Sequence, residues 1–377
     1  MGARYLERER QHLNDLLPGL DEALAGTALT ELEQPDSPAL EMFRAAGGPG
    51  LLVPAEHGGK GVDLLGAVRV QRAVGSRSPS LAIATTMHHF SVASLVETAA
   101  ASDGMEWMLL SAIAQDNLLL ASGFAEGNTG QGILTPTLTA RVEGDKIWLS
   151  GTKKPCSLAR SMNLLTASVA LPEPDGSTRL AVALVPADAP GVSVRPFWSS
   201  PVLAGAESDE VVLEDVEVPA DLVVRTDVTD DGRLDHLQTA GFVWFETLMT
   251  ASYLGVVSAL VERVLAAPKI DTSVKAEAAT NVHGAVLALD GLARTAATEL
   301  DENVLADALV CRYTAQRTIA HVADLCVEAL GGMAFISSGD IAYLNSACRA
   351  LAFHPPSRTR MTAALTDHFT GNPLRIS

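Results

Sequence analysis

The spacing of apolar residues divides the chain into two helical regions that flank a region with a different pattern. In residues 1–118 apolar positions recur every three or four residues, and Leu65, Val68 and Val74 suit one face of a helix. From about residue 232 to 370 this spacing returns in longer runs, which predict helices over 242–265, 276–299 and 304–330. Several long helices in succession favour a helical bundle.

The middle region, residues 119–226, alternates apolar and polar positions as strands do. Residues 138–142 and 146–150 alternate on either side of Glu143-Gly144-Asp145, which predicts a hairpin with a glycine in its loop. The runs 180–185 and 210–219 predict two further strands, the second of which ends at a proline. We therefore expect a small β-barrel or sandwich between the two helical regions.

Composition and charge narrow the class of protein. The chain has 377 residues, of which 47% are hydrophobic and 19% charged, so we expect ordered domains with sizeable cores. The formal net charge of −18 argues against a nucleic-acid or anionic-membrane partner, because both need a surplus of Lys and Arg. The first 20 residues are charged and lack a signal-peptide pattern, and no long apolar run predicts a membrane span. A cytoplasmic protein is expected.

Cysteine and histidine positions give little sign of a metal centre. The four cysteines form no C-x-x-C pair, so free thiols are expected rather than a disulfide scaffold. His88 and His89 follow two threonines on a predicted helix, without further ligands at suitable spacing. We expect this pair to lie in the core or along a substrate channel, and we predict no metal site.

Six segments, in order along most of the chain, resemble signatures of the acyl-CoA dehydrogenase superfamily. The clearest is G-F-A-E-G-N-T-G-Q-G at 123–132, which is similar to the family's flavin-binding loop T-E-P-x-x-G-S-D. About 20 residues later, W-L-S-G-T-K-K-P-C-S at 148–157 resembles the strand L-x-G-x-K-x-W-I-T. The other four segments are 53–61, 186–192, 213–219 and 328–335.

This resemblance implies an α+β fold with three parts and one FAD site. The parts are an N-terminal helical domain over 1–118, a middle β-barrel over 119–226 and a C-terminal four-helix bundle over 227–377. The residues that it places around the flavin are Phe124, Ala125, Gly130, Gln131, Pro155, Cys156, Ser157, Glu328, Gly331 and Gly332. Ser157 stands where the family has a threonine hydroxyl near the reactive flavin nitrogen. The family also implies a homodimer or homotetramer.

Several family contacts are altered in this chain. Ala125 replaces a threonine that bonds the flavin ring, and Pro155 replaces a tryptophan that covers one of its faces. Residues 268–274 lack the family's R-x-x-F-G pattern, which holds the adenosine half of FAD across a dimer. These changes favour a more open flavin site with fewer contacts.

The catalytic residues depart furthest from the family. Aligned without gaps, Arg358 occupies the position of the usual catalytic Glu, and arginine cannot act as a base. On the predicted helix over 242–265, Glu246 stands where the family has an arginine, so the two positions have exchanged charge. We hypothesise that Glu246 is a base with Arg358 as its charge partner; a structural ion pair is an equally open interpretation. His354, in the same altered loop, is a further candidate for proton transfer.

Three functions are compatible with these residues. The first is α,β-dehydrogenation of an acyl thioester, carried by coenzyme A or a carrier protein, with an unknown electron acceptor. The second is a flavin-dependent monooxygenase, which needs no Glu base and tolerates a more open flavin. The third is a non-catalytic homologue. The presence of Glu246 places dehydrogenation slightly ahead at this stage.

Overall fold

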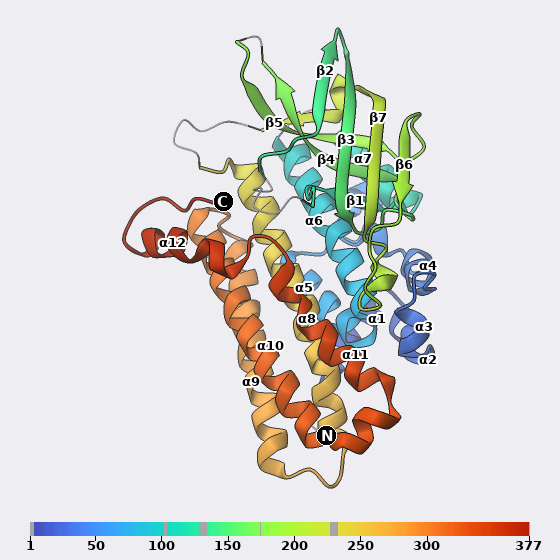
Figure 1. The fold of residues 1–377 in the computed structure, drawn as a ribbon, viewed down its shortest axis with the longest axis vertical. Coiled ribbons are helices and arrows are strands. Elements are labelled where there is room, and N and C mark those ends of the chain that lie inside the picture. Colours follow the sequence, from blue (N-terminus) through green and yellow to red (C-terminus); the bar gives the residue numbers. More distant parts are fainter. Residues whose placement is uncertain (1–3, 102–103, 128–133, 174, 227–232, 377) are drawn as a thin grey trace.

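A computed structural model of the chain describes all residues except 1–3, 102–103, 128–133, 174, 227–232 and 377. A β-sheet lies at one end of the molecule, and long helices extend away from it (Figure 1). Helices precede the sheet along the chain and follow it again, as the apolar spacing predicts. The α+β fold class is thereby confirmed.

The described N-terminal part contains the α-helices α1 to α7, of which α5 and α6 are the long core members. Asp63 caps α5 by accepting a hydrogen bond from the Gly66 N–H at 2.8 Å. The bounds are α1 Glu7–Leu16, α2 Leu20–Gly26, α3 Leu29–Leu32, α4 Ala39–Ala45, α5 Leu64–Arg77, α6 Pro79–Ala101 and α7 Glu106–Gln115.

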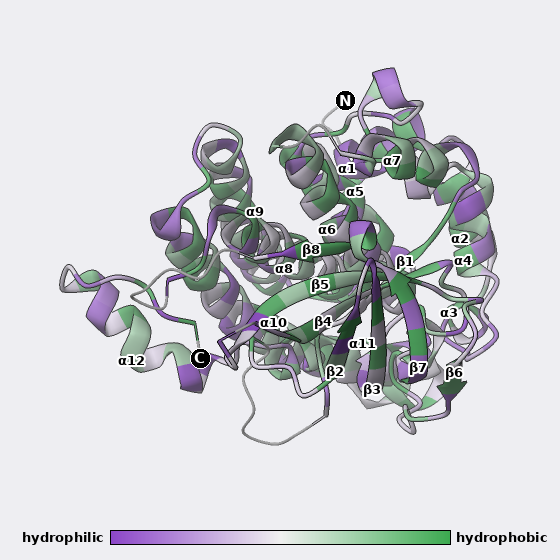
Figure 2. Cartoon of the chain, turned by 90° about the horizontal axis from the view of Figure 1, so that it is seen from above, coloured by the Kyte–Doolittle hydropathy of each residue, from purple (hydrophilic) through white to green (hydrophobic). Residues whose placement is uncertain are grey.

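Eight strands form one mixed sheet in the middle of the chain. Its order is β6-β7-β3-β2-β4-β5-β8, and β1 pairs with β4 in parallel. The predicted hairpin is present: Glu143 pairs with Lys146 across Gly144, whose φ of +65° suits a residue without a side chain. Strands β4 and β5 carry mostly hydrophobic residues (Figure 2).

The strand bounds include both further predicted strands, within β5 and β7. The eight are β1 Leu120–Gly123, β2 Thr139–Glu143, β3 Lys146–Cys156, β4 Leu164–Pro172, β5 Thr178–Pro186, β6 Val192–Arg195, β7 Asp209–Pro219 and β8 Val223–Arg225.

The C-terminal part is built on three long helices. Asp235 and Gln238 form a capping box at the start of α8, and Asp301 caps α10. Helix α10 is interrupted at Gly331, which has φ 80° and ψ 168°. The bounds are α8 His236–Ala266, α9 Thr272–Ala296, α10 Glu302–Ser337, α11 Gly339–Cys348 and α12 Arg358–Phe369.

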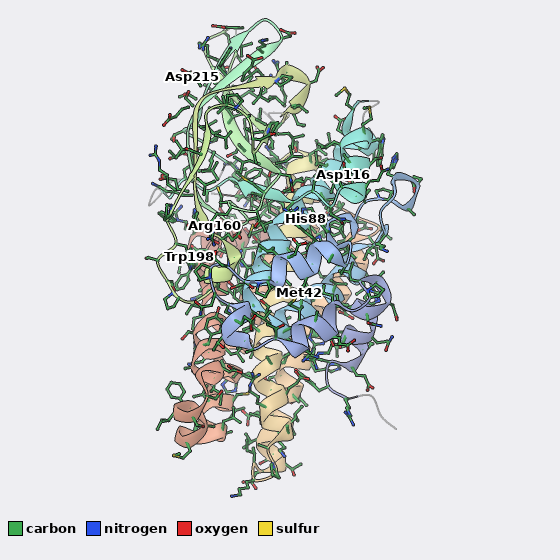
Figure 3. The ribbon with its side chains drawn as sticks, turned by 90° about the vertical axis from the view of Figure 1, so that its right-hand side faces the viewer. Met42, His88, Asp116, Arg160, Trp198 and Asp215 are labelled. Atoms are coloured by element: carbon green, nitrogen blue, oxygen red, sulfur yellow. The ribbon has the colours of Figure 1, made fainter. Side chains whose placement is uncertain are left out.

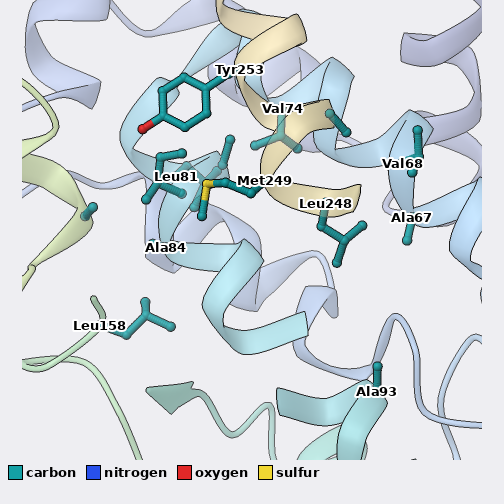
Figure 4. Close-up of a cluster of buried hydrophobic side chains, with 14 of the residues drawn as sticks. Ala67, Val68, Val74, Leu81, Ala84, Ala93, Leu158, Leu248, Met249 and Tyr253 are labelled. Carbon is teal, nitrogen blue, oxygen red and sulfur yellow. The ribbon is translucent and has the colours of Figure 1, made fainter. Parts of the chain in front are cut away.

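Helices α5 and α8 join the N-terminal and C-terminal parts through a close backbone contact. A Cβ atom added to Gly75 would lie 2.3 Å from the Ser252 carbonyl oxygen, and one added to Gly255 would lie 2.3 Å from the Arg72 carbonyl oxygen. Only glycine permits this approach. Buried side chains such as Val74, Leu81, Met249 and Tyr253 fill the space around it (Figure 4).

Two helices, α8 and α10, are long and apolar enough to cross a membrane by length and composition alone. In α8, 83% of the apolar window is buried inside the molecule, as expected for the core helix of a soluble protein. In α10 only 22% of the window is buried in the single chain. The side chains of Met333 and Ile336 near its end are 76% and 78% exposed.

Candidate active site

A cavity of about 450 Å³ lies where α6, α8, the sheet and residues 350–355 meet. This volume is within the usual range of small-molecule sites. Most of its wall is apolar, and five phenylalanines contribute to it: Phe90, Phe124, Phe242, Phe245 and Phe353. Phe90 lies against two of them, with ring centroids 5.4 Å from Phe245 and 6.3 Å from Phe124.

The two segments that most resemble flavin-binding signatures lie side by side in this wall. The Lys154 N–H donates to the Ala125 carbonyl oxygen at 2.8 Å, and Glu126 forms a parallel bridge with Lys154. As a result, Phe124, Ala125, Pro155 and Ser157 all line the cavity. The Ser157 hydroxyl lies 3.0 Å from the hydroxyl of Ser208, which also faces the cavity.

Other predicted flavin residues do not line the cavity. Cys156 is 0% exposed, and burial raises the pKa of its thiol to about 12. Glu328, Gly331 and Gly332 belong to the last turns of α10. The ion pair between Arg263 and Asp340, at 3.0 Å, places the chain just after α10 beside the far end of α8. Gly130 and Gln131 fall outside the described residues.

The charge partner of Glu246 is Arg312, so the predicted partnership with Arg358 was wrong. The Arg312 Nη1 atom lies 2.6 Å from the Glu246 Oε2 atom, and both side chains are 0% exposed. Arg358 is instead exposed at the start of α12. The ungapped alignment failed because the pairing depends on how α8 packs against α10, which carries Arg312.

Glu246 also does not line the cavity, although the preceding residue, Phe245, does. Burial raises the pKa of the Glu246 carboxyl to about 6, and the neighbouring Arg312 opposes that rise. The Glu246 carboxyl thus has a pKa near neutrality. It faces α10, however, and not the cavity.

His354 does line the cavity. Its Nε2 atom lies 2.8 Å from the Tyr253 hydroxyl oxygen. Burial, assisted by the nearby Arg312 charge, lowers the pKa of the imidazole to about 3, so the ring is neutral at physiological pH. The site therefore offers a neutral imidazole whose Nε2 atom is in contact with Tyr253.

Glu126 is the one carboxylate among the described residues that line the cavity. Its Oε1 atom lies 2.6 Å from the Lys153 Nζ atom, and it accepts hydrogen bonds from the backbone and hydroxyl of Thr137. Burial opposes ionisation, but these bonds outweigh it and lower the pKa to about 2. The Glu126 carboxylate is therefore occupied by Lys153 and by Thr137, which precedes β2.

The sequence analysis missed the face of α6 that lines the cavity. Met87, Phe90, Ser91, Ser94 and Thr98 follow the helical spacing of one face, and Gly241 on α8 lies opposite them. A Cβ atom added to Gly241 would meet only the Ser94 hydroxyl, at 3.1 Å. The helical spacing of these residues around the His88-His89 pair was the sequence signal that could have indicated this face.

The histidine pair is buried core, one of the two roles expected of it. The Leu120 N–H donates to the His88 Nδ1 atom at 3.1 Å, so Nε2 carries the proton and donates to the Pro49 carbonyl oxygen at 2.9 Å. His88 lies in the interior of the molecule, whereas Trp198 lies near the sheet, where it lines the cavity (Figure 3). Within the described part of the chain, no three His, Cys, Asp or Glu residues are placed to hold a metal ion.

Comparison with known proteins identifies the family. No model of a protein family matches the sequence. The chain is 48% identical over 377 residues to an isobutylamine N-hydroxylase of Streptomyces viridifaciens, covering 99% of this chain and 100% of that protein. Its fold matches glutaryl-coenzyme A dehydrogenase with a TM-score of 0.78 over 99% of this chain and 96% of that one, at 18% identity. This protein is a member of the acyl-CoA dehydrogenase superfamily.

A second solved structure concerns the cofactor. KijD3, in a complex with FMN and a dTDP-amino-keto-sugar, matches with a TM-score of 0.83 over 98% of this chain and 95% of that one, at 22% identity. Together with the N-hydroxylase and dehydrogenase relatives, it supports a flavin cofactor for this superfamily member.

The cavity residues themselves fit a flavin. An isoalloxazine ring has two apolar faces and a polar edge, and the cavity offers aromatic walls together with the hydroxyls of Ser122, Ser157 and Thr166. Ala125 and Gly127 carry little or no side chain, which leaves their backbone open to a ligand. The superfamily member is thus a flavin oxidoreductase.

Proposed function

We propose that the protein is a flavin-dependent monooxygenase that N-hydroxylates small primary alkylamines. The observation that carries this proposal is the absence of a free carboxylate among the described cavity-lining residues: Glu126 is bound by Lys153, and Glu246 faces Arg312. Abstraction of an α-proton from a thioester needs such a base in contact with the substrate. N-hydroxylation needs none, because the amine nitrogen supplies its own electron pair.

The cavity suits an amine in its neutral form. An ammonium ion would find aromatic and aliphatic walls and a neutral His354, without a free carboxylate among the described lining residues. Burial in such surroundings lowers the pKa of an amine and so exposes the nitrogen lone pair. The full-length similarity to an isobutylamine N-hydroxylase supports a short, branched alkyl group as substrate.

The reaction balances when a reduced flavin supplies two electrons and O₂ supplies both oxygen atoms. The amine R-NH₂, O₂ and the reduced flavin give R-NHOH, water and the oxidised flavin. We propose that Ser157, Phe124, Ala125 and Pro155 border the flavin, and that the other cavity-lining phenylalanines and the α6 face exclude water from the amine. We propose FAD as the flavin. FMN is the first alternative to test, because KijD3 was solved in a complex with FMN.

We propose that His354, which lines the cavity, interacts with the oxygen atom that leaves as water. The buried Tyr253 phenol is protonated, since burial raises its pKa above the usual value, and Nε2 of His354 is its acceptor. We propose that the ring proton of the neutral imidazole sits on Nδ1 and that this nitrogen meets the ligand. We propose that this N–H donates a hydrogen bond to the departing oxygen.

Dehydrogenation of an acyl thioester is the second candidate, and two observations favour it. The fold matches glutaryl-coenzyme A dehydrogenase, and the pKa of Glu246 near 6 suits a base. In this alternative Glu246 would have to leave Arg312 and reach the cavity. The substrate would be a coenzyme A or acyl-carrier-protein thioester.

One experiment separates the candidates. The protein is mixed aerobically with reduced FAD or FMN and isobutylamine, and products are identified by mass spectrometry. In parallel, the oxidised holoprotein is mixed anaerobically with a panel of acyl thioesters while the flavin absorbance is followed. We expect the N-hydroxylamine and no bleaching. Bleaching by a thioester would establish the dehydrogenase, and failure to retain either flavin would favour a non-catalytic homologue.

We also propose that the protein works in the cytoplasm as a homodimer or homotetramer. The exposed side chains of Met333, Phe335 and Ile336 form an apolar surface at the end of α10. This surface follows Glu328, Gly331 and Gly332 directly in the chain. A second copy that covers it would bury apolar area and bring these three residues to an interface. Light scattering of the purified protein at several concentrations tests this assembly.

A further inference from the structure

We infer that Glu246 and Arg312 form a positioning pair, which fixes residues 351–356 and through them the imidazole of His354 at the cavity. The inference rests on the proposed function, because it assigns His354 a role in the oxygen chemistry. In this account Glu246 does not contact the substrate. Its carboxylate acts indirectly, by holding Arg312.

Arg312 is the centre of this arrangement. It is 0% exposed and donates to three carbonyl oxygens of a single segment: Leu351 at 3.3 Å, Pro355 at 3.2 Å and His354. The neighbouring Tyr313 hydroxyl donates to the Pro356 carbonyl oxygen at 2.9 Å. Two consecutive residues of α10 thus hold four carbonyl groups of the segment.

The segment needs donors from elsewhere because of its composition. Pro355 and Pro356 have no backbone N–H, so they add acceptors to this segment without adding donors. A guanidinium group supplies several N–H donors in one rigid plane, which lysine cannot do. The sequence therefore pairs a proline-containing segment with a buried arginine on the helix beside it.

Glu246 makes the buried arginine tolerable and sets its orientation. A fully buried cation is costly unless a counter-charge is in contact, and the Glu246 Oε2 atom supplies it at 2.6 Å. The hydroxyl of Tyr253 contacts the Nε2 atom of His354 and so fixes the imidazole ring. The backbone of His354 is thus held by Arg312 and its ring by Tyr253, in a residue that lines the cavity.

A double-mutant cycle with His354→Ala tests whether the pair acts through His354. The variants are Glu246→Gln, Arg312→Lys and the charge-neutral double variant E246Q/R312Q, which keeps the test possible if either single variant fails to fold. The matched control is Glu9→Gln, which breaks another buried pair, between Glu9 and Arg72 at 2.7 Å, away from the cavity. The readout is the fraction of flavin oxidation that yields hydroxylamine.

We expect each pair variant to lower this fraction roughly tenfold, since small misplacements of a catalytic group are that costly. In the His354→Ala background the same substitutions should cost nothing further, because the effect passes through His354. Glu9→Gln should leave the fraction unchanged in both backgrounds. An equal loss with and without His354 would overturn the inference.

Hydrogen exchange of the amides in residues 350–354 supplies a readout that is independent of turnover. We expect faster exchange in the pair variants and wild-type exchange in Glu9→Gln. Wild-type exchange in the pair variants would show that the pair does not hold the segment. If the wild-type protein forms no hydroxylamine, the proposed function fails, whereas this measurement still decides whether the pair positions the segment.

Discussion

The hydroxyl oxygen of Tyr253 lies 2.8 Å from the Nε2 atom of His354, and the two residues are 101 positions apart in the chain. Tyr253 belongs to the core helix α8 and is 0% exposed, so its phenol is fixed by packing. A buried hydroxyl needs an acceptor, and Nε2 of the neutral imidazole supplies one. In the proposed mechanism this contact leaves Nδ1 as the nitrogen that meets the ligand.

Removing the Tyr253 hydroxyl should therefore damage catalysis more than folding. We expect Tyr253→Phe to lower the yield of hydroxylamine per flavin oxidised several-fold, because the His354 ring loses its fixed orientation. Stability should fall by about 1 kcal/mol, the usual net effect of one hydrogen bond. Tyr5→Phe is the control, since the Tyr5 hydroxyl lies 3.3 Å from the Ser258 hydroxyl, away from the cavity. Equal yields for both variants would contradict the role of Tyr253.

The cavity should lose room for branched amines when Gly241 is enlarged. A side chain at this position enters the cavity between α6 and α8, where a Cβ meets only the Ser94 hydroxyl. We expect Gly241→Leu to raise KM for isobutylamine at least about tenfold, roughly the effect of losing a few methylene contacts, and to affect ethylamine less. Gly284→Leu, on α9 with no atom within 4 Å of the added Cβ, should leave both KM values unchanged. A proportional loss for both amines would show that Gly241 does not set the size limit.

The buried Lys153–Glu126 pair should support the fold near the flavin loop. Lys153 is 0% exposed, and Lys153→Met leaves Glu126 without its buried counter-charge. We expect a loss of about 3–5 kcal/mol in the free energy of unfolding, measured with urea. The exposed pair between Lys146 and Glu217, at 2.6 Å, is the comparison, and Lys146→Met should change stability much less. Similar losses for the two variants would argue against a special role of the buried pair.

Acid should destabilise the protein partly through His88. Burial lowers the pKa of His88 to about 4, whereas the unfolded chain has the ordinary value near 6.5. The unfolded state therefore binds more protons, and the stability from neutral His88 is full above pH 6.5 and falls as pH decreases toward 4. By pH 4 the free energy of unfolding should fall by about 3 kcal/mol through this residue. Urea unfolding from pH 7.5 to 5 should show a flatter pH dependence for His88→Gln, and an unchanged slope would contradict this account.

Much of the fold could be predicted because its signals are local. Apolar spacing along α8 and α10, and alternation on either side of Gly144, are visible within short windows of sequence. The resemblance to a family correctly brought Phe124 and Ser157 to one cavity. Strand β4 carries no turn signal of its own and was not predicted; its pairing with β5 is a property of the folded sheet.

The partner of Glu246 could not be found in the same way. Pairing with Arg312 depends on how α8 and α10 pack, and no local pattern encodes that register. One hint was available: Arg312 is a charged residue inside an apolar helical run, where an arginine requires a buried partner. Alignment with the family pointed instead to Arg358, because it compares positions rather than contacts.

The most direct test of the proposed oxygen transfer is isotopic. The protein is supplied with reduced flavin and isobutylamine under ¹⁸O₂, and the product is analysed by mass spectrometry. A monooxygenase places one ¹⁸O atom on the amine nitrogen and the other in water, and the yield of labelled hydroxylamine per flavin oxidised should fall in His354→Ala. A product whose oxygen comes from unlabelled water, or an amine that returns unchanged while a thioester bleaches the flavin, would contradict the account.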